Sequence, residues 1–222
     1  MLVSHTHGFA FVHVPKTGGC SISLALQPYC DHVMRYWMNR WLDRIGVHVN
    51  HLAPHRLKRY RLHTPAETLR RQIPAAAFSR LHKFAFVRNP WDLLVSYYNF
   101  VRSTPRHHRS TRAVGLASFD RYVEYELRRD KISQSRMLCD RRGVLLVDDV
   151  GRFESIEADF ARICRRLGID ATLPHVNRGV IRDRRDYRTY YSRRLADRVA
   201  EHFAEDIERF GYQFESVLHD AA

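Results

Sequence analysis

Two segments of this chain, about seventy residues apart, each join a short apolar run to a turn suited to anions and then to a helical pattern. The first run is Phe9 to Val14, and the second is Phe84 to Val87. Runs of this length that are rich in β-formers predict strands buried on both faces, as in a parallel sheet. Because each of the two turns carries its own cation, the pair predicts a ligand with two separate anionic groups.

The first turn follows Pro15, which ends the strand because it lacks a backbone donor. Thr17-Gly18-Gly19 permits a tight path with positive φ, and a helix is predicted from Ser21 until Pro28 stops it. The amide groups at the helix start attract anions, and Lys16 adds a positive charge. In a Walker A loop the lysine follows the glycines, whereas here it precedes them. A glycine-rich structural turn with a solvated lysine is the alternative.

The second turn is a strong helix start, with Asn89 as N-cap and Pro90 at the first helical position. Arg88 therefore leaves the strand just before a helix N-terminus, and Ser96 follows about two helical turns later. An arginine fork together with a hydroxyl suits a phosphate monoester. The alternative is that Arg88 pairs with a structural carboxylate.

The rest of the chain predicts an α/β fold. A third strand is expected at residues 145–147, and helical patterns occupy 93–101, 156–167 and 195–210. Strands that alternate with helices favour a central sheet flanked by helices. With 222 residues and 45% hydrophobic content, one domain over residues 1–222 is expected, with its core at about 9–214.

Composition narrows the partners. The net charge of +13 favours anionic ligands without choosing among them. No run of eighteen apolar residues occurs, so no membrane span is expected, and the absence of a signal-peptide pattern makes a cytoplasmic protein the expectation. Four cysteines match no zinc pattern and are expected to be reduced thiols, with no metal site: Cys20, Cys30, Cys139 and Cys164.

Taken together, the two turns make the chain resemble the sulfotransferases that use 3′-phosphoadenosine 5′-phosphosulfate (PAPS), specifically the carbohydrate, family 2-like branch. Residues 16–21 resemble that family's 5′-phosphosulfate loop, and residues 88–96 resemble its 3′-phosphate segment. Further similar stretches are 138–140, 150–154, 173–177 and 204–212. The resemblance implies a fold with a central parallel sheet flanked by helices, akin to the P-loop kinases.

The resemblance also implies a reaction, in which a sulfuryl group moves from PAPS to a hydroxyl, expected to belong to a carbohydrate. The product nucleotide would be 3′,5′-bisphosphoadenosine (PAP), with no metal and no nucleic-acid partner. A late basic loop within 178–188 would contact the nucleotide. The implied donor-binding residues are Lys16, Thr17, Gly18, Gly19, Cys20, Ser21, Arg88 and Ser96. Cys20 departs from the hydroxyl residue usual in this loop. A thiol is a poor hydrogen-bond donor, but the main-chain N–H remains, so PAPS binding is expected to survive.

Sulfuryl transfer needs a general base and stabilisation of the leaving phosphate, the latter expected from Lys16. Among 14 histidines, His63 is favoured as base because it precedes Thr64-Pro65-Ala66-Glu67, a predicted capping box that would place it at a helix mouth. Its position upstream of the Arg88 segment also resembles that of the family's histidine in the 2-O-sulfotransferase-like branch. His51, His55, a glutamate or another histidine remain alternatives, and His13 is predicted to be structural.

Two other functions stay open at this point. A nucleotide or small-molecule kinase would use a similar sheet but would require magnesium. A non-catalytic basic module for nucleic acid or acidic glycan would show steep salt dependence and no preference for a 3′-phosphorylated nucleotide.

Overall fold

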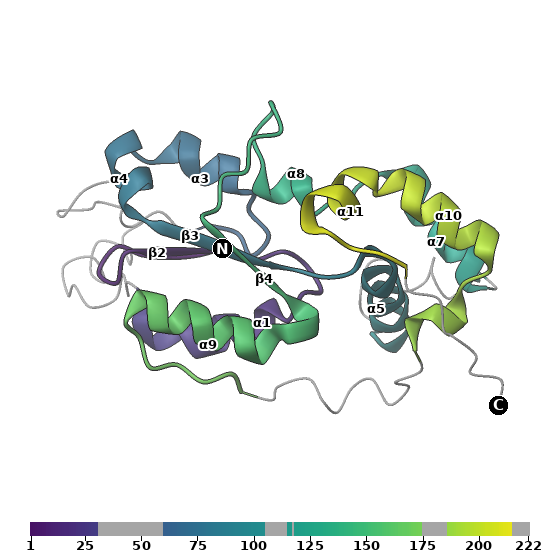
Figure 1. Ribbon diagram of the computed structural model, residues 1–222, viewed down its shortest axis with the longest axis horizontal. Coiled ribbons are helices and arrows are strands. Elements are labelled where there is room, and N and C mark those ends of the chain that lie inside the picture. Colours follow the sequence, from purple (N-terminus) through teal and green to yellow (C-terminus); the bar gives the residue numbers. More distant parts are fainter. Residues whose placement is uncertain (31–59, 105–114, 117, 175–185, 215–222) are drawn as a thin grey trace, which may run out of the picture.

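The centre of the fold is a four-stranded sheet, seen in a computed structural model that describes residues 1–30, 60–104, 115–116, 118–174 and 186–214. The strand order is β1 (Leu2–Ser4), β2 (Phe9–Val12), β3 (His82–Val87) and β4 (Asp149–Arg152). The last three strands run parallel, as the sequence predicts, whereas β1 pairs antiparallel with β2. The sheet is therefore mixed, and its parallel part carries both predicted turns at adjacent strand ends (Figure 1).

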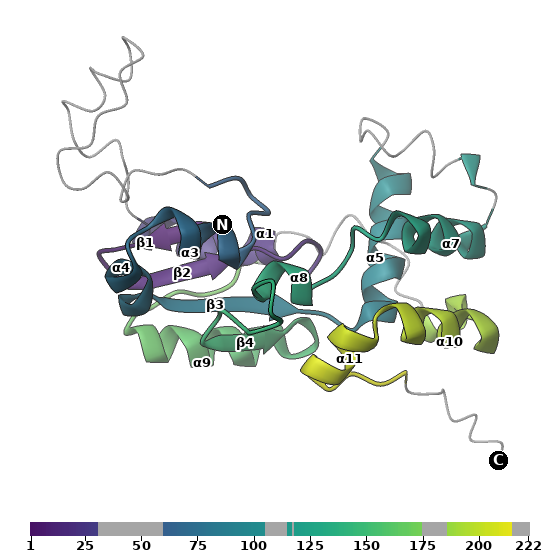
Figure 2. The ribbon, with the colours of Figure 1, turned by 90° about the horizontal axis from the view of Figure 1, so that it is seen from above.

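Helices cover both faces of the sheet because its strands alternate between two apolar layers. Phe9 and Phe11 pack with α1 (Gly19–Leu26) and α9 (Ile156–Leu167). Ala10 and Val12 face the opposite layer, which contains α3 (Ala66–Gln72), α4 (Ala75–Arg80) and α8 (Ser135–Leu138) (Figure 2). This two-sided burial confirms the interpretation of the continuous apolar runs.

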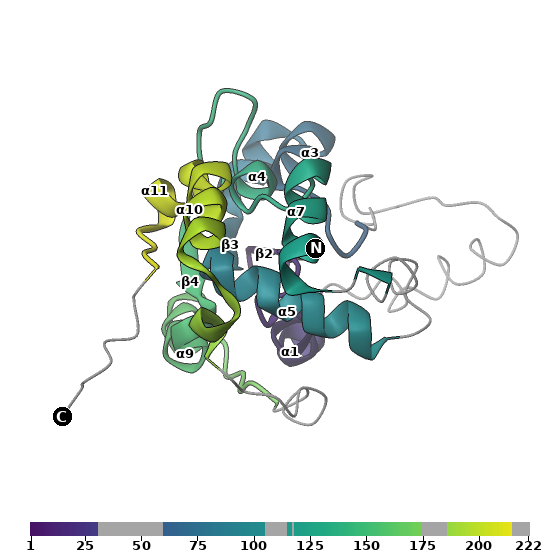
Figure 3. The ribbon, with the colours of Figure 1, turned by 90° about the vertical axis from the view of Figure 1, so that its right-hand side faces the viewer.

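A separate apolar cluster joins three helices beyond the ends of the strands (Figure 1, Figure 3). These helices are α5 (Pro90–Ser103), α7 (Phe119–Arg129) and α10 (Arg193–His202). Trp91, in the first turn of α5, donates its indole N–H to the Ala196 carbonyl of α10 at 3.0 Å. The short elements η1 (Gln27–Tyr29), η4 (Phe153–Ser155), η5 (Tyr187–Tyr190) and α11 (Ala204–Phe210) complete the described chain.

The third strand was predicted at the wrong residues. Leu146 and Val147 are buried but only lead into the sheet, and the strand that pairs with β3 begins at Asp149. Its Gly151 lies against Phe86, where a Cβ atom would come within 2.5 Å of the ring. The apolar residues therefore belong to the buried segment that leads into the strand. The strand itself can be polar, because its main chain rather than its side chains forms the hydrogen bonds to β3.

Two helical predictions also need correction. The stripe over 195–210 is broken at Phe203, whose backbone ends α10 and begins α11. The helix predicted from Ser21 to Pro28 starts at Gly19 and ends at Leu26, and Pro28 lies in the 3₁₀ turn that follows. Proline is tolerated there because the first positions of a helical turn need no donor.

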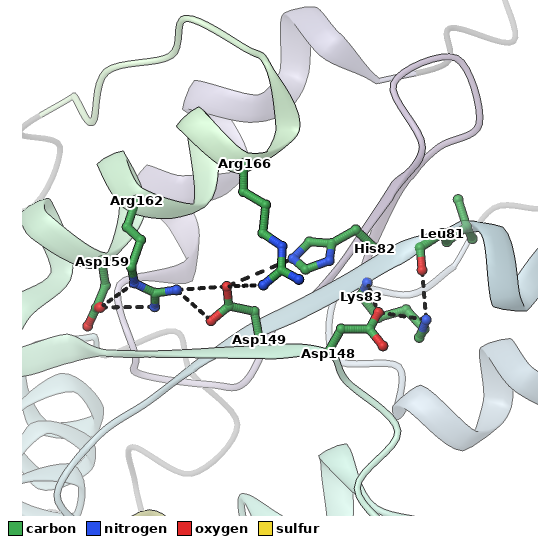
Figure 4. A network of polar contacts seen from close by, with 8 residues as sticks. All are labelled: Leu81, His82, Lys83, Asp148, Asp149, Asp159, Arg162 and Arg166. Carbon is green, nitrogen blue, oxygen red and sulfur yellow. Dashed lines mark hydrogen bonds and ion pairs between the residues drawn. The ribbon is translucent and has the colours of Figure 1, made fainter.

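Polar contacts hold β3 and β4 together at the strand ends remote from the two turns (Figure 4). The buried Lys83 amine donates to the Leu81 carbonyl and pairs with Asp148, both at 2.7 Å. Asp149 pairs with Arg162 of α9, also at 2.7 Å. The Lys83 pair joins β3 to the residue before β4, and the Arg162 pair ties β4 to α9.

Candidate functional site

The two predicted turns lie side by side because β2 and β3 are neighbouring parallel strands. Arg88 Nη1 donates to the main-chain carbonyl of Lys16 at 3.1 Å. This bond joins residues that are 72 positions apart in the chain. The structure therefore places the two expected cations in one site.

The Lys16 turn has a tightly constrained main chain. Lys16 and Gly18 both have positive φ, at 65° and 79°. A Cβ atom on Gly18 would lie 2.3 Å from Ile156, so glycine is required by space as well as by conformation. The Thr17 hydroxyl is fully buried and donates to the Val14 carbonyl at 2.9 Å. Thr17 thus contributes its side chain to the loop's own structure.

The helix α1 begins with Gly19, Cys20 and Ser21. The main-chain N–H groups of this first helical turn have no hydrogen-bond partner within the helix. Unpartnered amides at a helix start attract anions, which can complete their hydrogen bonds. The Cys20 side chain is exposed. The turn therefore fits the phosphosulfate group that the resemblance implies, with the amides as donors and a thiol in place of the usual hydroxyl.

The Lys16 amine is partly buried, 3.9 Å from the centre of the Phe100 ring. Burial lowers its pKa to about 8, with a smaller contribution from the nearby Arg88 charge, while Cys20 acts in the opposite direction. A lysine whose charge is poorly solvated gains more from an incoming anion than a lysine in bulk water. The environment thus favours binding of a phosphate or sulfate at this position.

The Arg88 guanidinium is held on three sides. Nε donates to the Asp92 carboxylate at 2.7 Å, Nη1 reaches Lys16, and the group stacks 4.0 Å from the centre of the Phe153 ring. Asp92 is therefore the structural carboxylate that the alternative for Arg88 predicts. Within the described part of the chain no hydrogen bond engages Nη2, which leaves this end of the fork for a ligand.

The helix start after Arg88 is as predicted. Asn89 caps α5 by accepting the Trp91 amide at 3.1 Å, and Pro90 occupies the first helical position. Ser96 lies further along the same helix and is 4% exposed. Its assignment to the donor's 3′-phosphate stays a prediction.

His63 lies against the Lys16 turn through His13. Its Nδ1 and the His13 carbonyl oxygen are 3.0 Å apart, and the two rings meet edge to face at 4.8 Å. A Cβ atom on Gly19 would fall 2.2 Å from the His13 ring, so His13 contacts both the loop and His63. Burial, and then the proximity of His63, lower the His13 pKa to about 3. His13 is therefore buried and neutral near pH 7, and the sequence prediction had assigned it a structural role.

The predicted capping box before α3 does not form. The helix begins at Ala66, and Pro65 rather than Thr64 occupies the cap position without a side-chain bond. The Thr64 hydroxyl instead donates to the Arg61 carbonyl at 2.8 Å, which closes a local turn. His63 is held by its bond with the His13 carbonyl, and the N-terminal amine of Met1 donates to the carbonyls of the two preceding residues. The alternatives His51 and His55, and residues 178–185 of the basic loop, lie outside the described residues.

Two residues that hold the site, Glu154 and Gln134, were not predicted from the sequence. Glu154 accepts the Asn89 amide at 2.7 Å and the Tyr212 hydroxyl at 3.1 Å. Gln134 bonds to the main chain of Arg88. Glu154 falls in one of the stretches that show the family resemblance, but its spacing alone does not indicate its partner. Gln134 precedes an unremarkable short helix.

Among the described residues, no group of three or more His, Cys, Asp or Glu side chains could hold a metal ion. In the same part of the chain, no helix combines the length and the apolarity that a membrane crossing requires.

Comparison with known proteins decides the family. A family model described as the sulfotransferase family matches residues 1–213. The chain belongs to the sulfotransferase family. A curated relative, an uncharacterized protein from Archaeoglobus fulgidus, is 24% identical over 110 residues that cover 49% of this chain and 86% of the relative. As a sulfotransferase, the protein transfers sulfuryl groups, and its family implies a nucleotide donor and a separate acceptor.

Proposed function

We propose that this sulfotransferase transfers the sulfuryl group of PAPS to the hydroxyl of a carbohydrate, with His63 as general base. The observation that carries the proposal is the contact between the two turns, in which Arg88 Nη1 donates to the Lys16 carbonyl. One continuous site thereby holds two cations suited to the two phosphorylated ends of the donor. The carbohydrate acceptor rests on the sequence resemblance and on the basic composition.

In this scheme the Lys16 turn holds the 5′-phosphosulfate, and Arg88 with Ser96 holds the 3′-phosphate. The acceptor oxygen attacks sulfur, and the bond between sulfur and the bridging phosphate oxygen breaks, so that its electron pair stays on the phosphate of PAP. The Lys16 ammonium stabilises that developing charge. The acceptor proton goes to His63.

The geometry of His63 supports its role as base. A carbonyl oxygen only accepts, so Nδ1 must donate its hydrogen to the His13 carbonyl. In the neutral ring this places the lone pair on Nε2, which is the form that can accept a proton. The His63 side chain is exposed, so the hydroxyl of a large acceptor can reach it.

The donor class is tested by thermal shift with PAP, AMP and ATP. Selective stabilisation by PAP is expected, because only PAP carries the 3′-phosphate assigned to Arg88. A preference for ATP with magnesium would indicate a kinase instead. Binding that depends steeply on salt, without preference for a 3′-phosphate, would indicate a basic binding module.

The base is tested with His63→Gln, since glutamine can donate to the His13 carbonyl but cannot take up the acceptor proton. Sulfuryl transfer is expected to fall by about 10²–10⁴-fold, with PAP affinity unchanged. His7→Gln is the matched control, because His7 is also exposed and its Nδ1 contacts a main-chain carbonyl, that of Tyr29, at 2.9 Å. Activity of the His63 variant within threefold of the unmodified protein would refute the assignment.

A further inference from the structure

The Gln134 side chain lies along the main chain of Arg88. Its Oε1 accepts the Arg88 amide and its Nε2 donates to the Arg88 carbonyl, both at 2.8 Å. The ladder between β3 and β4 ends at Val87, so these two main-chain groups lie beyond the sheet. The amide of Gln134, which is 1% exposed, takes the place that a neighbouring strand would have.

A buried carboxylate fixes Gln134 in turn. Asp206 of α11 is 1% exposed, and its Oδ2 accepts a hydrogen bond from the main-chain N–H of Gln134 at 2.8 Å. Its Oδ1 accepts the Ser135 amide at 2.7 Å and the Ser133 hydroxyl at 3.4 Å. These bonds satisfy the donors at the start of α8 and fix the main chain from which the Gln134 side chain extends.

We propose that Gln134, fixed by Asp206, is a positioning residue for recognition of the donor's 3′-phosphate. The inference rests on the proposed function, in which Arg88 binds that phosphate. Gln134 holds the peptide groups of Arg88, while Asp92, the Lys16 carbonyl and Phe153 hold the guanidinium. The arginine is therefore ordered along its whole length before the ligand arrives, which lowers the entropic cost of binding.

The next residue prevents the turn from adjusting. The Asn89 amide is bound to Glu154 at 2.7 Å, and the Asn89 side-chain amide donates to the Gln213 carbonyl at 3.2 Å. Because Asn89 is held in place, a displacement of the Arg88 main chain cannot be compensated by the residues that follow it. The displacement therefore moves the Arg88 guanidinium. Gln134 acts on phosphate recognition through Arg88, without touching the ligand.

The test compares Gln134→Ala with Gln72→Ala, a matched control because Gln72 is exposed at the end of α3. Dissociation constants are measured by calorimetry for PAP and for AMP, which lacks the 3′-phosphate. Gln134→Ala is expected to weaken PAP binding about tenfold and to change AMP binding less than about twofold. In turnover assays the KM for PAPS is expected to rise about tenfold at a kcat within about twofold of the unmodified protein.

The ratio of PAP to AMP affinity decides whether Gln134 acts on recognition of the 3′-phosphate. An equal loss of PAP and AMP affinity would show a merely structural role and overturn the proposal, as would an unchanged ratio of the two constants. If the unmodified protein does not prefer PAP to AMP, the proposed function itself fails. If Gln134→Ala does not fold, Gln134→Met carries the same test, since methionine keeps the length of the side chain, adds no charge and loses both bonds to the Arg88 main chain.

Discussion

The lowered pKa of Lys16 makes donor binding dependent on pH in a range where the ligand does not titrate. In the free protein this pKa is about 8, chiefly because the amine is buried. A bound phosphate adds a negative charge beside the amine and raises the pKa in the complex. Binding of PAP above pH 8 is therefore coupled to uptake of one proton, and affinity falls as the pH rises.

The magnitude follows from the pKa. At pH 7 about nine tenths of the free protein carries a charged Lys16, and at pH 9 about one tenth does. The affinity for PAP is expected to be constant from pH 7 to about 7.5 and to fall by about tenfold between pH 7 and pH 9, which corresponds to about 1.4 kcal/mol. The second ionisation of a phosphate monoester lies near pH 6, so the ligand charge is constant over this range.

The assay is calorimetric titration with PAP at half-unit steps from pH 7 to pH 9.5. It is carried out in the unmodified protein and in Cys20→Ser, because Cys20 acts on the Lys16 pKa. Lys16→Arg is expected to remove the decline, since arginine stays protonated, and Lys16→Gln to bind weakly at every pH. A decline of the same size that persists in Lys16→Gln would refute the reasoning, as would constant affinity in the parent up to pH 9.5.

Three further predictions concern the surroundings of the site. Gly19→Ala places a Cβ atom 2.2 Å from the buried His13 ring, and it should lower the free energy of unfolding by about 1–3 kcal/mol in urea titrations. Gly115→Ala is the control and should leave the free energy of unfolding unchanged, because its Cβ atom would meet nothing within 4 Å. His13 is neutral in the native state down to pH about 3, whereas in the unfolded chain it takes up a proton near pH 6.5. The free energy of unfolding should therefore fall as the pH is lowered through this window, by up to about 1.4 kcal/mol per pH unit. The His13→Gln variant should show a smaller fall over the same window. Arg88→Lys should weaken PAP binding by about tenfold or more in calorimetry, because lysine loses the fork that reaches both Asp92 and the Lys16 carbonyl; unchanged affinity would contradict this role.

Much of the fold and part of the site could be predicted from local patterns. The buried strands at Phe9 and Phe84, the positive φ at Gly18 and the N-cap at Asn89 were predicted correctly. Each depends on steric limits or hydrogen bonds within a few residues. The third parallel strand was predicted at the wrong residues. Leu146 and Val147 are buried, but the segment that pairs with β3 begins at Asp149, because a residue can be buried without lying in a strand.

The capping box shows why a local pattern can fail. Thr64 and Glu67 have the right spacing, yet the Thr64 hydroxyl closes a turn with Arg61 and the helix starts at Ala66. Two hydrogen-bonded arrangements of similar energy compete at such a site, and the tertiary fold selects one. His63 therefore lies near the Lys16 turn for a different reason from the one that the sequence suggested.

By itself, the sequence determined two strand-to-helix turns with a cation each, because proline, glycine and asparagine restrict the backbone locally. Only the tertiary structure decided that the Arg88 guanidinium reaches the Lys16 carbonyl, that His63 donates to His13, and that Gln134 holds Arg88. These contacts join residues 72, 50 and 46 positions apart. Their geometry depends on parallel strand register and on the packing of helices around the sheet, which no local pattern specifies.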